Sequence, residues 1–444
     1  MIVSCGQNHE TYLKKVSLDT LAPSPPMGWN SWLTYGTDVR EDEIKAIADY
    51  MAANLKQYGW EYVVIDLGWY SKEIAQGMEY YKARPHQIID EYGRLIPDTI
   101  KFPSAASGKG LKPVADYIHN KGLKIGIHVM RGIPYSAAEK HTPVLHTNFF
   151  ADDITLYDEG CAWYDGMRKV DMNHPAGQAY YNSIVELYAS WGIDFIKADD
   201  MQVWPYHTKE VEGMHNAIET IGRPMILSLS PGGPPPQDRN HPIRFSNMYR
   251  LTGDLWDTWE AVYEHFEVCK QYEFYQKPNH WGDCDLMPVG KINLRGENGK
   301  GERISRLSYN EQKTLVTLWS IFRSPLFLSN NIVQTDSLLL SLLTNKEVIE
   351  VDQHSTNNRQ LFSKDSTVAW IADGMNENSA AKYIALFNTG IKTRDVSVDF
   401  EQLKISGEII VRDLWVKKDI GKLKEIKASI GSHGAVLYKL LILN

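Results

Sequence analysis

Short apolar segments alternate with helical patterns through the first three quarters of the chain, and this alternation limits the fold more than any other feature. Strands that alternate with helices imply a parallel sheet. Eight repeats over about 310 residues favour a closed (β/α)8 TIM barrel over an open sheet. The predicted strands lie within residues 27–32, 62–70, 123–131, 191–199, 224–230, 245–254, 280–287 and 322–328. Predicted helices lie at 38–57, 112–120, 177–190, 209–221, from about 256, and at 308–321.

The pattern changes after about residue 350, where short alternating strands are separated by turn signals. They lie at 368–372, 382–388, 394–400, 407–412 and 435–441. This pattern is typical of a small antiparallel β-sandwich. We therefore expect an N-terminal arm at 1–21, a catalytic barrel at 22–346 and a C-terminal β-sandwich domain at 347–444.

Charge and composition limit the classes of partner that the protein can have. The net charge of −8 argues against nucleic acid as a partner, and the longest apolar runs are too short to span a membrane. The first ten residues lack a signal-peptide pattern and the four cysteines form no CxxC, so we expect a cytoplasmic protein, or a periplasmic or secreted one if a leader has been removed. A homo-oligomer is possible.

Ionisable and aromatic residues recur at the C-terminal ends of the predicted strands. Packing gives no reason to choose the same end repeatedly, whereas a parallel barrel presents its catalytic groups at that face. The residues are Trp32, Asp66 with Trp69, His128 with Arg131, Lys197 with Asp199, Arg250 with Asp254, and Asp283 with Asp285.

The fourth predicted strand ends in a cluster of ionisable residues: Lys197, Asp199 and Asp200 fall within four positions. Lys197 and Asp199 are two positions apart, so they point to the same side of the strand, whereas Asp200 points to the other. A lysine beside an aspartate keeps the carboxylate ionised, as a nucleophile or a charge stabiliser requires. A structural ion pair at a strand end is the alternative interpretation. Asp200, Asp283 and Arg131 are expected to be structural, Arg131 as an ion-pair partner.

Three chemistries could use a barrel mouth rich in carboxylates. Magnesium-dependent barrels use oxygen ligands, whereas zinc hydrolases need clustered histidines, which this sequence lacks. Glycoside hydrolysis needs two carboxyl groups and side chains that hold a sugar, and the 13 Trp and 24 Tyr favour it. No GxGxxG follows the first strand and no GxxxxGK[ST] occurs, so we expect no nucleotide cofactor. Glycoside hydrolysis by two carboxyl groups also needs no metal, and we expect none.

Five motifs in order, and the later segment Arg323–Leu326, resemble glycoside hydrolase family 27, which contains α-galactosidases and α-N-acetylgalactosaminidases. The resemblance runs from about residue 22 to the end and implies a retaining double displacement without a cofactor, in which the two carboxyl groups lie about 5–5.5 Å apart. The five motifs are Pro26–Trp32, Val64–Asp66, Phe195–Asp199, Arg250–Trp259 and Trp281–Met287.

The resemblance also implies roles for individual residues. Asp199 matches the nucleophile and Asp254 the general acid/base. The expected sugar-binding residues comprise cations, an aromatic wall, carboxylates that accept from hydroxyls, a histidine where the family often has tyrosine, and a serine in the loop over the sugar 2-substituent. They are Lys197, Arg250, Trp32, Asp66, Asp285, His128 and Ser230.

Two departures concern the choice of sugar. Galactose-specific members carry a second aspartate after the residue that matches Asp66, and it binds the axial hydroxyl; here the position is Leu67. A site without that acceptor loses discrimination for the hydroxyl. Ser230 and Gly233 stand where galactosidases have larger residues, and we expect them to leave room for an N-acetyl group or another substituent.

The sequence therefore predicts a retaining exo-glycosidase that acts on an oligosaccharide or glycoconjugate with a terminal α-linked galactose-type sugar. α-Galactosidase and α-N-acetylgalactosaminidase are the leading specificities, and β-L-arabinopyranosidase is the alternative, because its substrate has the same ring without the C6 hydroxymethyl group. A sugar-binding barrel without catalysis and a magnesium-dependent barrel lyase are alternatives of other classes. The carboxyl pair argues against the first, and sensitivity to chelators would identify the second.

Overall fold

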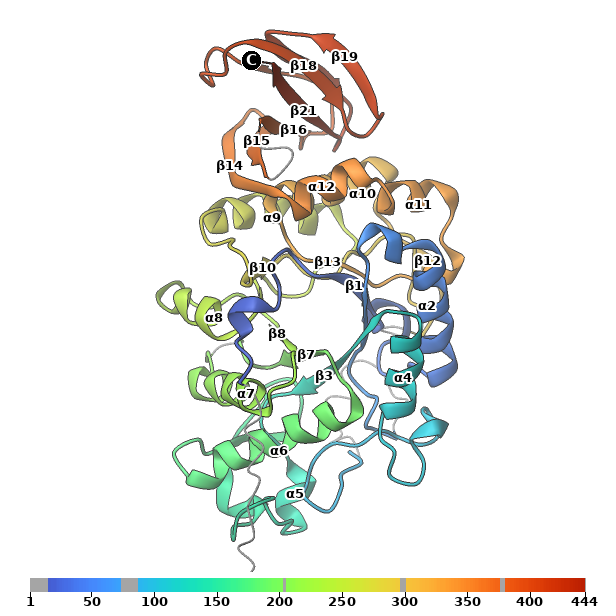
Figure 1. Ribbon diagram of the computed structural model, residues 1–444, viewed down its shortest axis with the longest axis vertical. Coiled ribbons are helices and arrows are strands. Elements are labelled where there is room, and N and C mark those ends of the chain that lie inside the picture. The colour runs from blue at the N-terminus through green and yellow to red at the C-terminus, as the bar shows by residue number, and fades with distance from the viewer. Residues whose placement is uncertain (1–14, 73–86, 203–204, 296–300, 376–379, 444) are drawn as a thin grey trace, which may run out of the picture.

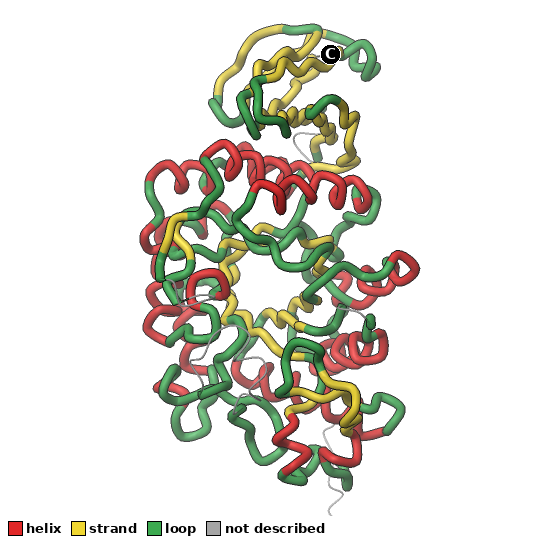
Figure 2. The backbone as a smooth tube through the Cα atoms, turned by 180° about the vertical axis from the view of Figure 1, so that it is seen from behind, coloured by secondary structure: helices red, strands yellow, loops and turns green. Residues whose placement is uncertain are grey.

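Eight parallel strands form the centre of the molecule. The computed structural model describes residues 15–72, 87–202, 205–295, 301–375 and 380–443. The strand order in the sheet is β10-β9-β8-β7-β3-β2-β1-β13. Figures 1 and 2 show these strands as a ring surrounded by helices, as expected for a TIM barrel. The strands are β1 (Met27–Asn30), β2 (Tyr62–Ile65), β3 (Lys124–Met130), β7 (Phe195–Asp199), β8 (Ile226–Leu229), β9 (Met248–Arg250), β10 (Trp281–Asp283) and β13 (Leu326–Leu328).

The ring closes just beyond β10. Met287 pairs in parallel with Leu328, and the Met287 amide donates to the Phe327 carbonyl oxygen at 2.8 Å. The first residues of several strands are large and apolar, and they pack together as a buried layer that includes Tyr62, Phe195, Met248, Trp281 and Phe327. β7 and β9, by contrast, end in Asp199 and Arg250. One end of the barrel is therefore filled with apolar side chains, and charged groups gather at the other.

Helices cover the outside of the barrel. The predicted helix 38–57 is shorter, because it begins at Glu41 and gives way to a turn after Asn54. The described helices of the barrel are α1 (Trp32–Tyr35), α2 (Glu41–Asn54), α4 (Lys112–Asn120), α5 (Tyr135–Glu139), α6 (Pro175–Trp191), α7 (Thr208–Ile221), α8 (Asn240–Phe245), α9 (Trp259–Tyr272), α10 (Tyr309–Phe322), α11 (Ser337–Leu343) and α12 (Lys346–Gln353).

Two small sheets were not predicted from the sequence. The stretch before α6 contains a three-stranded antiparallel sheet of β4 (Ile133–Pro134), β5 (Thr155–Gly160) and β6 (Met167–Val170). β11 (Lys291–Ile292) and β12 (Arg303–Ile304) form a hairpin. The predicted strand 245–254 contains only β9, because α8 ends at Phe245 and the chain bends after Arg250.

The predicted N-terminal arm is described from residue 15, and its first 14 residues lie outside the described part. Leu18 is buried, and its carbonyl oxygen accepts from Asn247 Nδ2 at 2.8 Å, directly before β9. The Asp19 carboxylate lies 2.9 Å from His280 Nε2, directly before β10. Residues 15–21 are thus attached to the end of the barrel at which the strands begin.

The C-terminal region forms a β-sandwich, as expected. A six-stranded antiparallel sheet has the order β14-β15-β16-β21-β18-β19, and a two-stranded sheet pairs β17 with β20. Residues of both sheets, such as Ile384 and Val411, form a separate buried core together with Phe400, which directly follows β17. The strands are β14 (Ser355–Lys364), β15 (Thr367–Gly374), β16 (Ala381–Asn388), β17 (Arg394–Asp399), β18 (Glu408–Asp413), β19 (Lys418–Lys422), β20 (Glu425–Ile430) and β21 (Ala435–Leu443). β14, β19 and β20 were not predicted.

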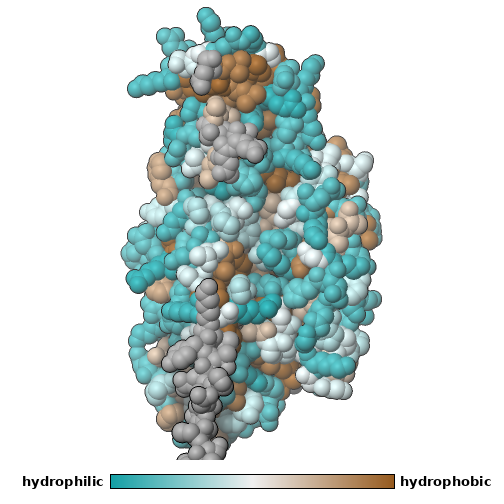
Figure 3. All heavy atoms as spheres, in the orientation of Figure 1, coloured by the Kyte–Doolittle hydropathy of each residue, from teal (hydrophilic) through white to brown (hydrophobic). Residues whose placement is uncertain are grey.

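The sandwich joins the barrel through α10, which packs against β16 and β21. Trp370 and Phe387 of the sandwich belong to the same buried apolar cluster as the barrel helices. The Phe387 ring meets the Phe266 ring edge-on at 5.1 Å between centroids. Figure 3 shows a mainly hydrophilic face, with apolar surface gathered over the sandwich. Among the described helices, none has the length and apolar character needed to cross a membrane.

Candidate active site

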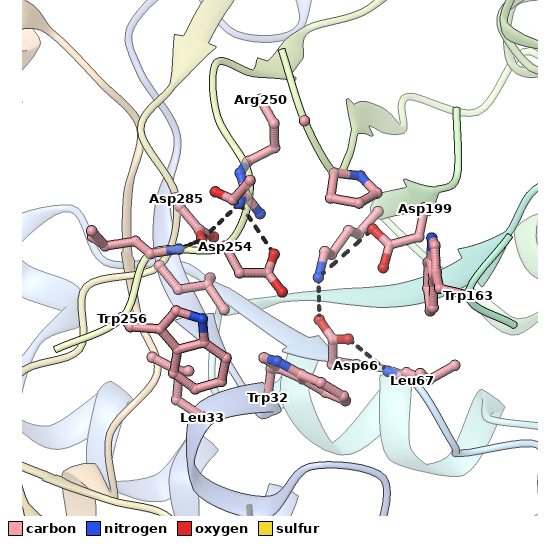
Figure 4. A pocket seen from close by; sticks show the side chains of 16 residues that line it. Trp32, Leu33, Asp66, Leu67, Trp163, Asp199, Arg250, Asp254, Trp256 and Asp285 are labelled. Atoms are coloured by element: carbon pink, nitrogen blue, oxygen red, sulfur yellow. Dashed lines mark hydrogen bonds and ion pairs between the residues drawn. The ribbon is translucent and has the colours of Figure 1, made fainter. Parts of the chain in front are cut away.

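A pocket of about 320 Å³ opens at the end of the barrel where the strands finish. Its size falls within the range of small-molecule sites. Seven of the nine residues expected at the site line this one pocket: Trp32, Asp66, Lys197, Asp199, Arg250, Asp254 and Asp285. Figure 4 shows Asp199 and Asp254 on opposite sides of the pocket, with both carboxylates directed into it.

Asp199 ends β7 and is contacted from two neighbouring strands. His128 Nε2 on β3 lies 2.8 Å from Asp199 Oδ2, and Ser230 Oγ, just after β8, donates to Asp199 Oδ1. Lys197 Nζ lies 3.9 Å from Oδ1. Burial alone would raise the pKa of Asp199, but the charge of Lys197 and the contacts of His128 and Ser230 outweigh it and hold this pKa well below its usual range. The carboxylate is therefore ionised at neutral pH.

Asp66 and Lys197 form a buried pair beside Asp199. Lys197 Nζ donates to Asp66 Oδ2 at 2.8 Å, and Asn30 Nδ2 donates to the same oxygen at 2.6 Å. Burial opposes both charges, but Lys197 lowers the pKa of Asp66, and Asp199 together with Asp66 raises the pKa of Lys197. The alternation predicted for β7 is confirmed, because Asp200 turns away and pairs with Arg131 at 2.7 Å.

Arg250 connects two carboxylates on the opposite side of the pocket. Its Nη2 lies 2.7 Å from Asp285 Oδ2 and 3.3 Å from Asp254 Oδ1. The side chain of Asp254 is 51% exposed, whereas that of Asp285 is 5% exposed. Asp254 thus stands at the pocket mouth, and Asp285 lies below it.

Asp285 is the carboxyl group whose proton affinity rises most clearly within the pocket. Burial raises its pKa to about 7; Arg250 opposes this effect, and the charges of Asp254 and Asp283 add to it. Asp285 also accepts a hydrogen bond from the Leu255 amide at 2.7 Å, so it connects Arg250 to the loop that carries Asp254. The residue has a left-handed backbone with φ of 82°.

Three tryptophans line the pocket, and only Trp32 was expected. Trp163 comes from the segment between β5 and β6, and Trp256 follows Asp254 by two residues. Figure 4 shows Trp256 near Leu33 and on the same side of the pocket as Asp254. Trp256 lies within the motif Arg250–Trp259, whereas no sequence signal marks Trp163, which lies in an irregular stretch.

Other predicted residues lie behind the pocket surface. His128 and Ser230 contact Asp199 and do not line the pocket, so their direct contact with a sugar stays a prediction. Trp69 is buried against Tyr188 and Trp191 rather than facing the site.

Leu67 lies on the pocket wall next to Asp66, and its amide donates to Asp66 Oδ1 at 2.7 Å. Gly233 does not line the pocket, and a Cβ at that position would come within 2.4 Å of the Leu251 carbonyl oxygen, so the close approach of this backbone requires glycine. Pro231 and Gly232 line the pocket instead. Room for an N-acetyl group beside Ser230 and Gly233 stays a prediction.

Two models of known protein families match the chain. The family model described as alpha galactosidase A matches residues 24–139 and 159–354, and that of the alpha galactosidase C-terminal beta sandwich domain matches 364–440. The chain belongs to glycoside hydrolase family 27. This membership confirms the resemblance drawn from the sequence motifs and makes the protein a glycosidase.

Three relatives illustrate the range of family 27. A β-L-arabinopyranosidase of this family from Geobacillus stearothermophilus, solved with arabinose, is 41% identical, with a TM-score of 0.92 over 96% of this chain and 99% of its own. A putative α-N-acetylgalactosaminidase from Bacillus halodurans is 38% identical, with a TM-score of 0.84 over 94% and 97%. Alpha-galactosidase A of Cellvibrio japonicus is 28% identical over 95% of this chain and 93% of its own.

Proposed function

We propose that the protein is a retaining exo-glycosidase that removes terminal β-L-arabinopyranosyl residues, with Asp199 as nucleophile and Asp254 as general acid/base. The observation that carries the choice of sugar is Leu67, an apolar side chain in the pocket wall beside Asp66. The 41% identical arabinopyranosidase supports the same choice.

The proposed mechanism has two displacements. Asp199 attacks the anomeric carbon while Asp254, in its protonated form, donates a proton to the glycosidic oxygen, and the leaving group departs. The resulting glycosyl-enzyme ester is then hydrolysed by a water that gives its proton to Asp254. Lys197 and His128 suit Asp199 to this role, because they keep its carboxylate ionised.

The preference for arabinopyranose follows from the hydroxyl groups of the sugar. β-L-Arabinopyranosides have the ring configuration of α-D-galactopyranosides, but they carry hydrogen where galactose carries a hydroxymethyl group. The axial hydroxyl is common to both sugars and loses its acceptor in either case. Leu67 is also larger than aspartate and cannot accept a hydrogen bond, so the C6 hydroxymethyl group of galactose would find less room and no partner beside it. Arabinopyranose, which lacks the C6 hydroxymethyl group, therefore loses less binding free energy than galactose when it enters this pocket.

α-Galactosidase activity is the second candidate, because Asp66, Lys197, Asp199 and Arg250 all line the same pocket and suit either sugar. α-N-Acetylgalactosaminidase activity is the third candidate, and the 38% identical putative α-N-acetylgalactosaminidase supports it.

The test is release of nitrophenol from the β-L-arabinopyranoside, the α-galactoside and the α-N-acetylgalactosaminide, each with and without EDTA. We expect metal-independent cleavage with the highest kcat/KM for the arabinopyranoside. Leu67→Asp should shift the ratio of kcat/KM toward the galactoside by about tenfold or more, because a hydroxyl regains an acceptor. A wild type that prefers the galactoside, or a ratio unmoved by the substitution, would refute the proposed role of Leu67.

A further inference from the structure

We propose that Trp256 is the platform on which the leaving group of the substrate rests, and that it selects leaving groups with an apolar face, such as a second pyranose or an aryl group. The inference rests on the proposed function, in which Asp254 protonates the glycosidic oxygen. It extends that function from the sugar that is cleaved off to the group that departs.

The position of Trp256 is the first observation. The residue lines the pocket and follows Asp254 by two positions. It is 37% exposed, which makes it the tryptophan of the pocket that meets solvent most clearly. Within the described residues, the Trp256 indole has no hydrogen bond and no ring contact. A large apolar ring thus stands open at the mouth.

The direction of the reaction links this ring to the leaving group. The acid that protonates the glycosidic oxygen must lie within hydrogen-bond reach of it, so the departing group lies on the side of Asp254. Figure 4 shows the Trp256 ring on that side, near Leu33. Trp163 is drawn across the pocket beside Asp199, far from where a group protonated by Asp254 would leave.

The chemistry of the ring indicates what it would bind. Indole offers a wide apolar face at low entropic cost, because only two side-chain torsions must be fixed. One face of a pyranose presents C–H groups, and an aryl ring presents its π face, so both can lie flat on it. Leu33 and Leu255 also line the pocket and extend its apolar surface.

The loop that carries Trp256 is fixed on both sides of the residue. Before it, the Leu255 amide donates to Asp285 Oδ2 at 2.7 Å. After it, the buried Asp257 carboxylate accepts from Arg303 Nη2 at 2.9 Å and from the Arg306 amide at 2.7 Å. A platform that is already positioned loses little entropy when it binds. The loop therefore suits recognition of a leaving group as well as delivery of a proton.

The test compares leaving groups on one sugar. For Trp256→Ala, we expect kcat/KM to fall by about tenfold for the 4-nitrophenyl glycoside and for a disaccharide, the size of one lost aromatic contact. The methyl glycoside also needs a proton from Asp254 but is too small to cover the ring, so its loss should stay below twofold. Trp256→Phe should retain most of the preference. Tyr263→Ala is the matched control, because this aromatic residue is 53% exposed and does not line the pocket.

A second measurement does not depend on turnover. Phenyl and methyl thioglycosides, which resist hydrolysis, are titrated into wild type and Trp256→Ala by calorimetry. The wild type should bind the phenyl compound about tenfold more tightly, and the variant should lose that preference. Equal losses on methyl and nitrophenyl glycosides, or an unchanged thioglycoside preference, would overturn the platform. Loss of the preference in a protein that hydrolyses none of the glycosides would retain the platform and reject the proposed function.

Discussion

Asp199 shows how single residues establish the chemistry of this site. The carboxylate sits in a buried setting that would favour its neutral form. Lys197 on the same strand, together with His128 and Ser230 from the neighbouring strands, reverses that preference. Lys197 acts through its charge, whereas His128 and Ser230 act through direct contacts. A substitution that removes the charge of Asp199 but keeps its shape therefore distinguishes its role in nucleophilic attack from its role in packing.

Asp199→Asn should lower kcat by at least about 10⁴-fold, because an amide cannot form the glycosyl ester. The substitution keeps the size of the side chain and an oxygen that can accept from Ser230, so the melting temperature should change by only a few degrees. Nitrophenol release and thermal unfolding measure the two effects. Activity within tenfold of wild type would contradict the nucleophile assignment.

Asp285 predicts a pH dependence of stability. Burial raises its pKa to about 7 in the folded protein, against about 3.9 for a free aspartate. Between these values the folded state binds more protons than the unfolded state, so the stability contributed by this group is present below about pH 4 and is lost as the pH rises through 7.

Asp285→Asn should remove this dependence, because asparagine does not titrate and can still accept from Leu255 and Arg250. Urea unfolding at pH 5 and pH 8 measures it. We expect wild type to lose more stability than the variant over this interval, with a slope difference of up to about 1.4 kcal/mol per pH unit for one proton. Parallel curves for the two proteins would argue against a raised pKa of Asp285.

At the scale of elements, the loop after β9 is held in place by ion pairs with the β11–β12 hairpin and the residues that follow it. Asp257 is fully buried and pairs with Arg303 of β12 and with Arg306, two residues after that strand. Burial opposes its charge, but the hydrogen bonds of both arginines lower its pKa to about 2. The hairpin thereby fixes the loop that carries Asp254.

Asp257→Ala should lower kcat/KM by about 10- to 100-fold, because small displacements of a catalytic group cost rate steeply. The loss should be similar for methyl and nitrophenyl glycosides, in contrast to Trp256→Ala. The arginines are partly exposed and can turn to solvent, so we expect only a modest decrease in melting temperature. A loss confined to one leaving group would mean that Asp257 does not act by positioning Asp254.

Most barrel elements could be predicted because each strand is a short apolar run followed by turn residues and an amphipathic helix. Asp66, Lys197, Asp199, Arg250 and Asp254 were found from their places at strand ends and from the motifs around them. Short strands such as β4 and β11 span two residues each and carry no periodic signal. Trp163 was missed for the same reason, since its approach to the pocket depends on tertiary packing.

At the scale of the whole molecule, the barrel and the sandwich share an apolar interface built around α10. Phe387 of β16 is completely buried and meets Phe266 of α9, while Trp370 of β15 meets Phe322 of α10 at 6.2 Å between ring centroids. The sandwich also has its own core, which includes Phe400. A substitution at the interface can therefore be compared with one in the core of the sandwich for its effect on the stability of the barrel.

Phe387→Ala should destabilise the protein by about 3–5 kcal/mol and lower the temperature at which the barrel loses activity. Phe400→Ala removes the same side chain from the core of the sandwich, and we expect its effect on barrel inactivation to be smaller. Calorimetry and residual activity after heating measure both. An inactivation temperature unchanged by Phe387→Ala would show that the barrel is stable without the sandwich.

The buried ion pairs of the pocket also have a consequence for the solvent in which the enzyme works. Lys197–Asp66 and Arg250–Asp285 join groups less than 3 Å apart in a largely buried environment, where dissolved ions screen poorly. The proposed substrate is uncharged, so no long-range attraction guides its arrival. Catalysis should therefore hold nearly constant from dilute buffer to about 1 M sodium chloride, unlike that of enzymes that capture ionic substrates.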